Sequence, residues 1–117
     1  MQLQFEDAWQ RTIAPQDRQI IEELFKNEHA NYRHPIIRVA INHRKQLLVS
    51  VLVQNHSAKE MIFMNRQVQF HTPTANRSHH FTIKSLKIPP YTSMPWTFIF
   101  EQAPENYSDG QITIATP

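Results

Sequence analysis

The sequence predicts a mainly β protein: an immunoglobulin-like antiparallel β-sandwich of about six or seven strands, with one α-helix near the N-terminus. Two observations lead to this prediction. A segment before residue 30 has apolar residues at helical spacing, and from residue 35 onward apolar residues recur at every second position. These later runs are short and are separated by turn-forming residues, which is typical of β-sandwiches.

Length and composition agree with a single globular domain. The 117 residues can build one core, and 40% of them are hydrophobic while 19% are charged. We expect one domain over 1–117, with an N-terminal segment and helix at 1–34 and the sandwich at 35–117. The net charge of +2 is small, so nucleic acid is not an expected partner. The absence of cysteine excludes disulfides and thiolate chemistry.

The helix is predicted over residues 15–28. Pro15 suits the first helical turn, because a backbone N–H would be unpaired there in any residue. Asp17 lies early and Lys26 lies late in the segment, which matches the helix dipole. The expected apolar stripe consists of Ile20, Ile21, Leu24 and Phe25.

After Pro35 the apolar period changes to two, which indicates strands. We expect Ile37, Val39 and Ile41 to share one face of the first strand. Polar or turn-forming clusters then divide the chain into further strands of similar length. The predicted strands lie at 36–43, 47–54, 61–72, 78–86, 96–100 and 111–116.

Residues 88–100, IPPYTSMPWTFIF, form the most unusual stretch. Proline cannot donate to a β-ladder, so we expect the prolines to end one strand at a corner before the next begins. Trp96, Phe98 and Phe100 then fall on one face of a strand. An aromatic stripe of this kind is more often core than a binding platform, and we predict that the three rings are buried.

Enzyme motifs are missing from the sequence. It contains no GxSxG, no P-loop and no HExxH, and its single glycine excludes a glycine-rich phosphate loop. We therefore expect a protein without catalytic activity and without a cofactor.

The histidines offer one alternative. If a turn at 73–77 closes a hairpin centred near Ala75, His71 lies opposite His79, and opposed residues share a face. Two imidazoles so placed could bind Zn²⁺ or Ni²⁺, but a stable site needs a third or fourth ligand. We expect no metal site, and keep His71 and His79 as the weaker alternative.

The stretch at 88–100 also resembles the signature of a known family. Ile88-Pro89-Pro90, the polar pair Thr92-Ser93 and the run Pro95-Trp96-Thr97-Phe98 with Phe100 are similar, in this order, to a motif of the SLAP domain, the S-layer-assembly domain of Bacillus-type bacteria. Looser similarities are the N-terminal segment from Phe5 to Trp9 before a helix, and the strand that ends at Asn55-x-Ser57-x-Lys59.

The resemblance implies a β-sandwich accessory protein for the export of surface-layer proteins through the accessory Sec pathway. Its expected partners are surface-layer proteins or the accessory Sec ATPase, and no catalytic residues carry over from the family. The N-terminus has neither the basic nor the apolar region of a signal peptide, and no run is long enough to span a membrane. We expect a location in the cytoplasm or close to the membrane; the alternative is a cell-wall or matrix module at the cell surface.

The first strand is the expected binding element. An edge strand over 36–43 would offer unpaired N–H and C=O groups to an extended segment of a partner, and Val39 lies at its centre. Trp9 and Tyr91 are the candidate aromatic anchors, because aromatic residues are enriched at interfaces. The alternative for both is packing within the fold.

Overall fold

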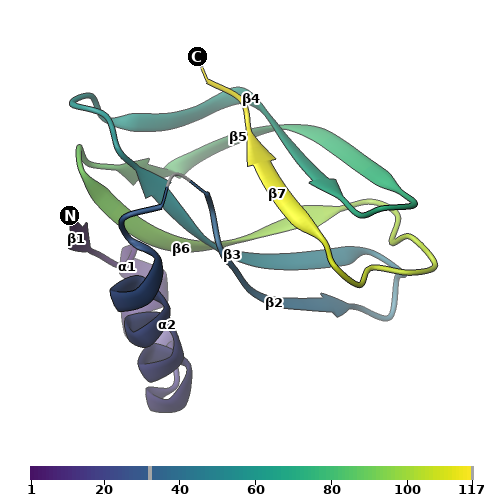
Figure 1. Cartoon of the computed structure of the whole chain (residues 1–117), viewed down its shortest axis with the longest axis horizontal. Coiled ribbons are helices and arrows are strands. Elements are labelled where there is room, and N and C mark those ends of the chain that lie inside the picture. Colours follow the sequence, from purple (N-terminus) through teal and green to yellow (C-terminus); the bar gives the residue numbers. More distant parts are fainter. Residues whose placement is uncertain (32, 117) are drawn as a thin grey trace.

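Two β-sheets packed face to face form the body of the protein, with two helices beside the four-stranded sheet near the N-terminus (Figure 1). The computed structural model describes residues 1–31 and 33–116. The four-stranded sheet has the order β1 (Gln2–Leu3), β6 (Thr92–Phe100), β3 (Leu47–Asn55) and β2 (Ile36–Ile41). The three-stranded sheet has the order β5 (Asn76–Ile88), β4 (Met61–His71) and β7 (Gln111–Ile114). The predicted β-sandwich is confirmed. All described pairings are antiparallel except that of β1 with β6.

Alternate residues of the strands fill the space between the sheets. Phe98 and Phe100 of β6 are 0% and 2% exposed. Both rings pack against Phe81 of β5, with centroids 5.2 and 5.7 Å away. The aromatic run of β6 is therefore a core strand, as predicted. Trp96 differs from the prediction, because it is only partly buried at the margin of the core; a ring of its size is rarely enclosed completely.

Pro95 lies inside a strand, although we expected every proline of this stretch to precede it. Pro89 and Pro90 do form the corner between β5 and β6, but Pro95 is paired opposite Leu52 of β3. Because main-chain groups alternate in direction along a strand, the missing N–H of Pro95 falls on the side away from β3. On that side β1 pairs only with Thr92 and Ser93. Pro95 therefore removes no bond from the ladder.

A β-bulge changes the predicted face of the first strand. Ile36 pairs with Val51 and Arg38 with Ser50, so Ile37 is an extra residue between them. Val39 and Ile36 pack against the core, whereas Ile37 lines a groove on the outer face. The prediction that Ile37 shares a face with Val39 and Ile41 is therefore wrong, since one inserted residue reverses the alternation.

The predicted helix is α2 (Pro15–Glu28), with Pro15 in its first turn as expected. Within the apolar stripe the burial is uneven: Ile21 is 1% exposed, but Ile20 is 54% exposed. Adjacent residues of a helix point about 100° apart, so only one of the two can face the sheet directly.

A second, shorter helix precedes α2 and was not predicted. This helix, α1 (Asp7–Thr12), begins after Glu6, whose carboxylate accepts from the N–H of Ala8 at 2.7 Å. The connection after it leads directly into Pro15. The N-terminal segment is thus an ordered part of the domain and contributes both β1 and α1.

Gln54 ties the end of α2 to the four-stranded sheet. The residue is 2% exposed, and its side-chain amide donates to the backbone carbonyls of Glu28, Asn31 and Arg33 at 3.1, 3.2 and 2.7 Å. Its side-chain carbonyl accepts from the hydroxyl of Ser93 on β6 at 3.2 Å. One buried amide therefore binds main-chain carbonyls at and after the helix terminus, where the helix itself supplies no donors. The carbonyls of Glu28 and Asn31 also have second partners, the N–H of Asn31 and Nε2 of His56.

Asn55, the next residue of β3, holds the corner between β5 and β6 by side-chain hydrogen bonds to backbone carbonyls. Its amide donates to the backbone carbonyls of Lys59, Ile88 and Pro89 at 2.8, 3.0 and 3.0 Å. Its side-chain oxygen accepts from both the N–H and the hydroxyl of Ser57, at 3.0 and 2.7 Å. The two sequence elements 55–59 and 88–90 thus meet at one asparagine that is 1% exposed.

We predict that Asn55→Ala lowers the free energy of unfolding by about 2–4 kcal/mol, because three carbonyls of the corner lose the hydrogen bond from the Asn55 amide. Urea denaturation measures the loss. Asn76→Ala, at an exposed asparagine of the β4–β5 hairpin, is the matched control and should change the value by less than about 0.5 kcal/mol. Equal effects of the two substitutions would contradict this role of Asn55.

His34 lies between the helix end and the sheet and stays neutral. Its Nδ1 accepts from the backbone N–H of Gln54 at 3.0 Å. Burial, with a smaller contribution from the charge of His56, lowers the pKa of His34 to about 4.

This pKa predicts a loss of stability in acid. Between pH 6.5 and 4 the unfolded chain binds a proton at His34 that the folded chain does not bind, so the free energy of unfolding falls as the pH falls through this range. The difference amounts to about 3 kcal/mol for a shift of this size. In His34→Asn, the Asn oxygen can still accept from Gln54 but does not titrate, so the decline between pH 6.5 and 5 should shrink. An unchanged pH profile would contradict the assignment.

Candidate partner-binding site

The outer edge of β2 carries unpaired main-chain groups. β2 is the last strand of its sheet, and its other neighbour is β3. At the hairpin, the N–H of Asn42 donates to the carbonyl of Gln46 at 3.2 Å. Because such pairs alternate along an antiparallel ladder, the N–H and C=O groups of Val39 and Ile41 point away from β3. The expectation of an edge strand here is confirmed, over Ile36–Ile41.

A cleft of about 430 Å³ lies between β2 and β7, the edge strands on this side of the two sheets. Its apolar lining comes from Pro35 and Ile36 on one side and from Ile112 and Ile114 on the other. Arg33 and the neutral ring of His34 lie at its margin. The cleft is therefore an open side of the sandwich, where apolar side chains of both sheets can be reached from the edge of β2.

A second hollow, a groove of about 420 Å³, lies on the outer face of β2, between this strand and the two helices. Trp9 and Ile13 line it from the N-terminal segment, and Ile37 and Arg38 line it from β2. The two hollows thus flank β2 on its two faces. The bulge makes this possible, because it directs the neighbouring residues Ile36 and Ile37 into different hollows.

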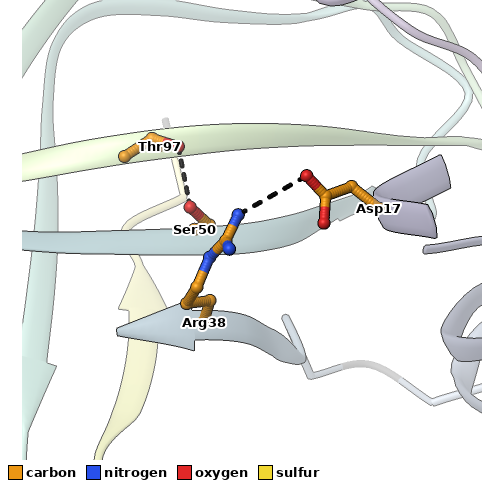
Figure 2. A network of polar contacts seen from close by, with 4 residues as sticks. All are labelled: Asp17, Arg38, Ser50 and Thr97. Carbon is orange, nitrogen blue, oxygen red and sulfur yellow. Dashed lines mark hydrogen bonds and ion pairs between the residues drawn. The ribbon is translucent and has the colours of Figure 1, made fainter. Parts of the chain in front are cut away.

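The polar contacts of the groove are shown in Figure 2. Arg38 of β2 reaches Asp17 of α2, with Nη2 and Oδ2 3.8 Å apart, and beside it the hydroxyls of Ser50 and Thr97 are hydrogen-bonded at 2.8 Å. The side chains of Arg38 and Asp17 are 64% and 41% exposed. An exposed pair of this kind contributes about 0–1 kcal/mol, so Arg38 can exchange this partner for another at little cost.

The structure brings two of the three predicted binding residues to this strand. Val39 lies on β2, with its side chain half-buried toward the core and its main chain at the free edge. Trp9 is half-buried and lines the groove. Tyr91 is 53% exposed but lies at the corner between β5 and β6, where its N–H donates to the carbonyl of Ser57 at 3.2 Å. It lines neither hollow beside β2.

The proposed pair of His71 and His79 does not form. His71 is opposite Asn76, and His79 is opposite Val68. Residues 68 and 71 point to opposite sides of β4, so the two imidazoles lie on different faces of the sheet. The hairpin closes tightly because the hydroxyl of Thr72 accepts from the N–H of Ala75 at 3.0 Å, so the turn is centred between residues 73 and 74 and not at Ala75.

The histidines are held by other contacts. Nε2 of His71 lies 2.9 Å from the hydroxyl of Thr113 on β7, and the ring of His79 packs on Phe81 with centroids 4.7 Å apart. Over residues 1–31 and 33–116, no group of three or more potential ligands from His, Cys, Asp and Glu could hold a metal ion. The pairing that suggested a metal site is therefore overturned.

Sequence reasoning missed both hollows, because each one joins segments that are distant in the chain. One signal was present. Ile36 and Ile37 are adjacent apolar residues at the start of a run with period two, and such a break in the alternation marks a bulge. In the described part of the chain, no helix combines the length and apolarity needed to cross a membrane.

Comparison with known proteins identifies the family. Searches of curated proteins and of solved structures gave no significant match. The family model of the SLAP domain matches residues 3–112, which include both helices and the strands of both sheets up to the middle of β7. The chain therefore belongs to the SLAP domain family, whose domains are associated with the surface layer.

Proposed function

We propose that this SLAP domain is a non-enzymatic binding factor that assists the secretion or assembly of surface-layer proteins through the accessory Sec pathway. On this proposal its partners are surface-layer proteins or the accessory Sec ATPase, and it works in the cytoplasm or close to the membrane. Membership in the SLAP family supports the association with the surface layer.

The observation that carries the proposal is the free edge of β2. An extended segment of another protein can add to such an edge through main-chain hydrogen bonds, while its alternate side chains enter pockets on the two faces. β2 offers both requirements, since the main-chain groups of Val39 and Ile41 are unpaired toward this side and a hollow lies on each face of the strand. This arrangement suits a chain that has not yet folded, such as a protein awaiting export.

We predict that Val39→Pro weakens capture of a surface-layer precursor at least about fivefold, because proline removes an N–H that a partner strand would use and adds a ring at the edge. The substitution removes no bond to β3, since the N–H of Val39 points away from that strand. Pull-down of the precursor by the purified domain measures the effect.

Val39→Thr is the matched control, because threonine has a similar shape and keeps the N–H. It should capture the precursor as the unaltered protein does, and thermal unfolding of both variants verifies that they are folded. Undiminished capture by a folded Val39→Pro variant would count against the proposal. Recovery of the protein in the wall fraction, with no precursor bound, would favour the alternative of a cell-wall module.

A further inference from the structure

We propose that the segment which adds to β2 is an acidic, extended stretch of the partner in which apolar and acidic residues alternate. The inference rests on the proposed function, because it uses the same edge, and it specifies the chemistry of the segment that this edge selects. Two independent features of the strand lead to it: the distribution of charge along it and the different nature of its two faces.

The first feature is charge. Between residues 33 and 46 the chain carries four exposed cations and neither Asp nor Glu. These cations are Arg33, Arg38, Arg44 and Lys45. The whole protein has a net charge of only +2, from 12 Lys and Arg against 10 Asp and Glu, so this edge is more basic than the molecule as a whole. Acids near it are Asp17, which is paired with Arg38, Glu28 at the cleft, and Glu101, which directly follows Phe100, the residue opposite Leu47.

The second feature is that the two faces of β2 differ. Toward the three-stranded sheet, Val39 packs against the core, as does Ile36, which lines the cleft together with Ile112 and Ile114. Toward the outer face, Arg38 and Ala40 alternate with Val39. A strand added beside β2 repeats this alternation, because neighbouring residues at the same level of a sheet share a face. Its inward positions therefore meet apolar atoms, and its outward positions meet Arg38.

Arg38 is free to serve this role. Its contact with Asp17 is long, at 3.8 Å, and both side chains are substantially exposed. A carboxylate on the adjacent strand would lie directly across from Arg38, in the position where opposite charges stabilise a cross-strand pair. The same charges disfavour a second copy of this chain as the occupant, because two β2 strands placed edge to edge would bring like charges together.

The test uses two labelled peptides of about eight residues, one alternating valine with glutamate and the other alternating valine with lysine. Fluorescence anisotropy measures their binding to the full chain at low and at high salt. We expect the acidic peptide to bind at least about tenfold more tightly than the basic one, with an affinity that falls as salt is added.

Arg38→Glu should reduce binding of the acidic peptide and raise binding of the basic one. The matched control is Lys84→Glu, which makes the same change of charge at an exposed position on β5 of the other sheet and should leave both affinities nearly unchanged. Equal affinity for the two peptides would overturn the inference. Absence of binding by the acidic peptide would also overturn it. Equal effects of Arg38→Glu and Lys84→Glu would overturn it as well, because binding would then depend on net charge alone.

The experiments distinguish a failure of this inference from a failure of the proposed function. If a surface-layer precursor is captured, but neither salt nor Arg38→Glu alters the capture, the inference fails and the proposed function stands. If the acidic peptide binds as expected and no surface-layer protein is captured, the inference stands and the proposed function fails.

Discussion

Two consecutive side-chain amides, Gln54 and Asn55 at the end of β3, hold the parts of this protein together. Because neighbouring strand residues point to opposite faces, one amide reaches outward to the end of α2 and the other reaches inward to the corner at 88–90. Both are almost fully buried. The position of β2 depends on the first of them, since the connection from α2 into β2 is fixed by hydrogen bonds to Gln54. The free edge and both hollows therefore depend on this junction.

Much of the fold could be predicted from local pattern. The bounds of α2 follow from Pro15 and an apolar stripe, and the core strand β6 follows from its alternating aromatics. The features that were not predicted depend on single hydrogen bonds or insertions. Glu6 caps α1, and the hydroxyl of Thr72 shortens the β4–β5 turn. The shortened turn is sufficient to separate His71 from His79, because it pairs His71 with Asn76, a register shift of three residues, and any odd shift exchanges the faces of a strand.

The candidate site was only half predictable. An apolar run directly after a proline indicated the edge strand, and Val39 lies on it. The cleft could not be predicted, because β7 lies about 70 residues further along the chain and its position relative to β2 follows only from the order of strands in both sheets. The prolines of the corner, by contrast, have a structural role: the carbonyl of Pro89 accepts from Asn55 and that of Pro90 accepts from the hydroxyl of Thr92. The most recognisable stretch of the sequence therefore builds the corner and the core strand, and not the binding edge.

Hydrogen exchange at single amides tests the central claim, that β2 is a free edge to which a partner adds a strand. In the free protein, the amides of Val39 and Ile41 should exchange rapidly, while those of Val49 and Val51 in the central strand β3 are protected. Adding the captured partner segment should protect Val39 and Ile41 and leave the core strands unchanged. Slow exchange of both amides in the free protein, or rapid exchange that persists in the complex, would contradict the account.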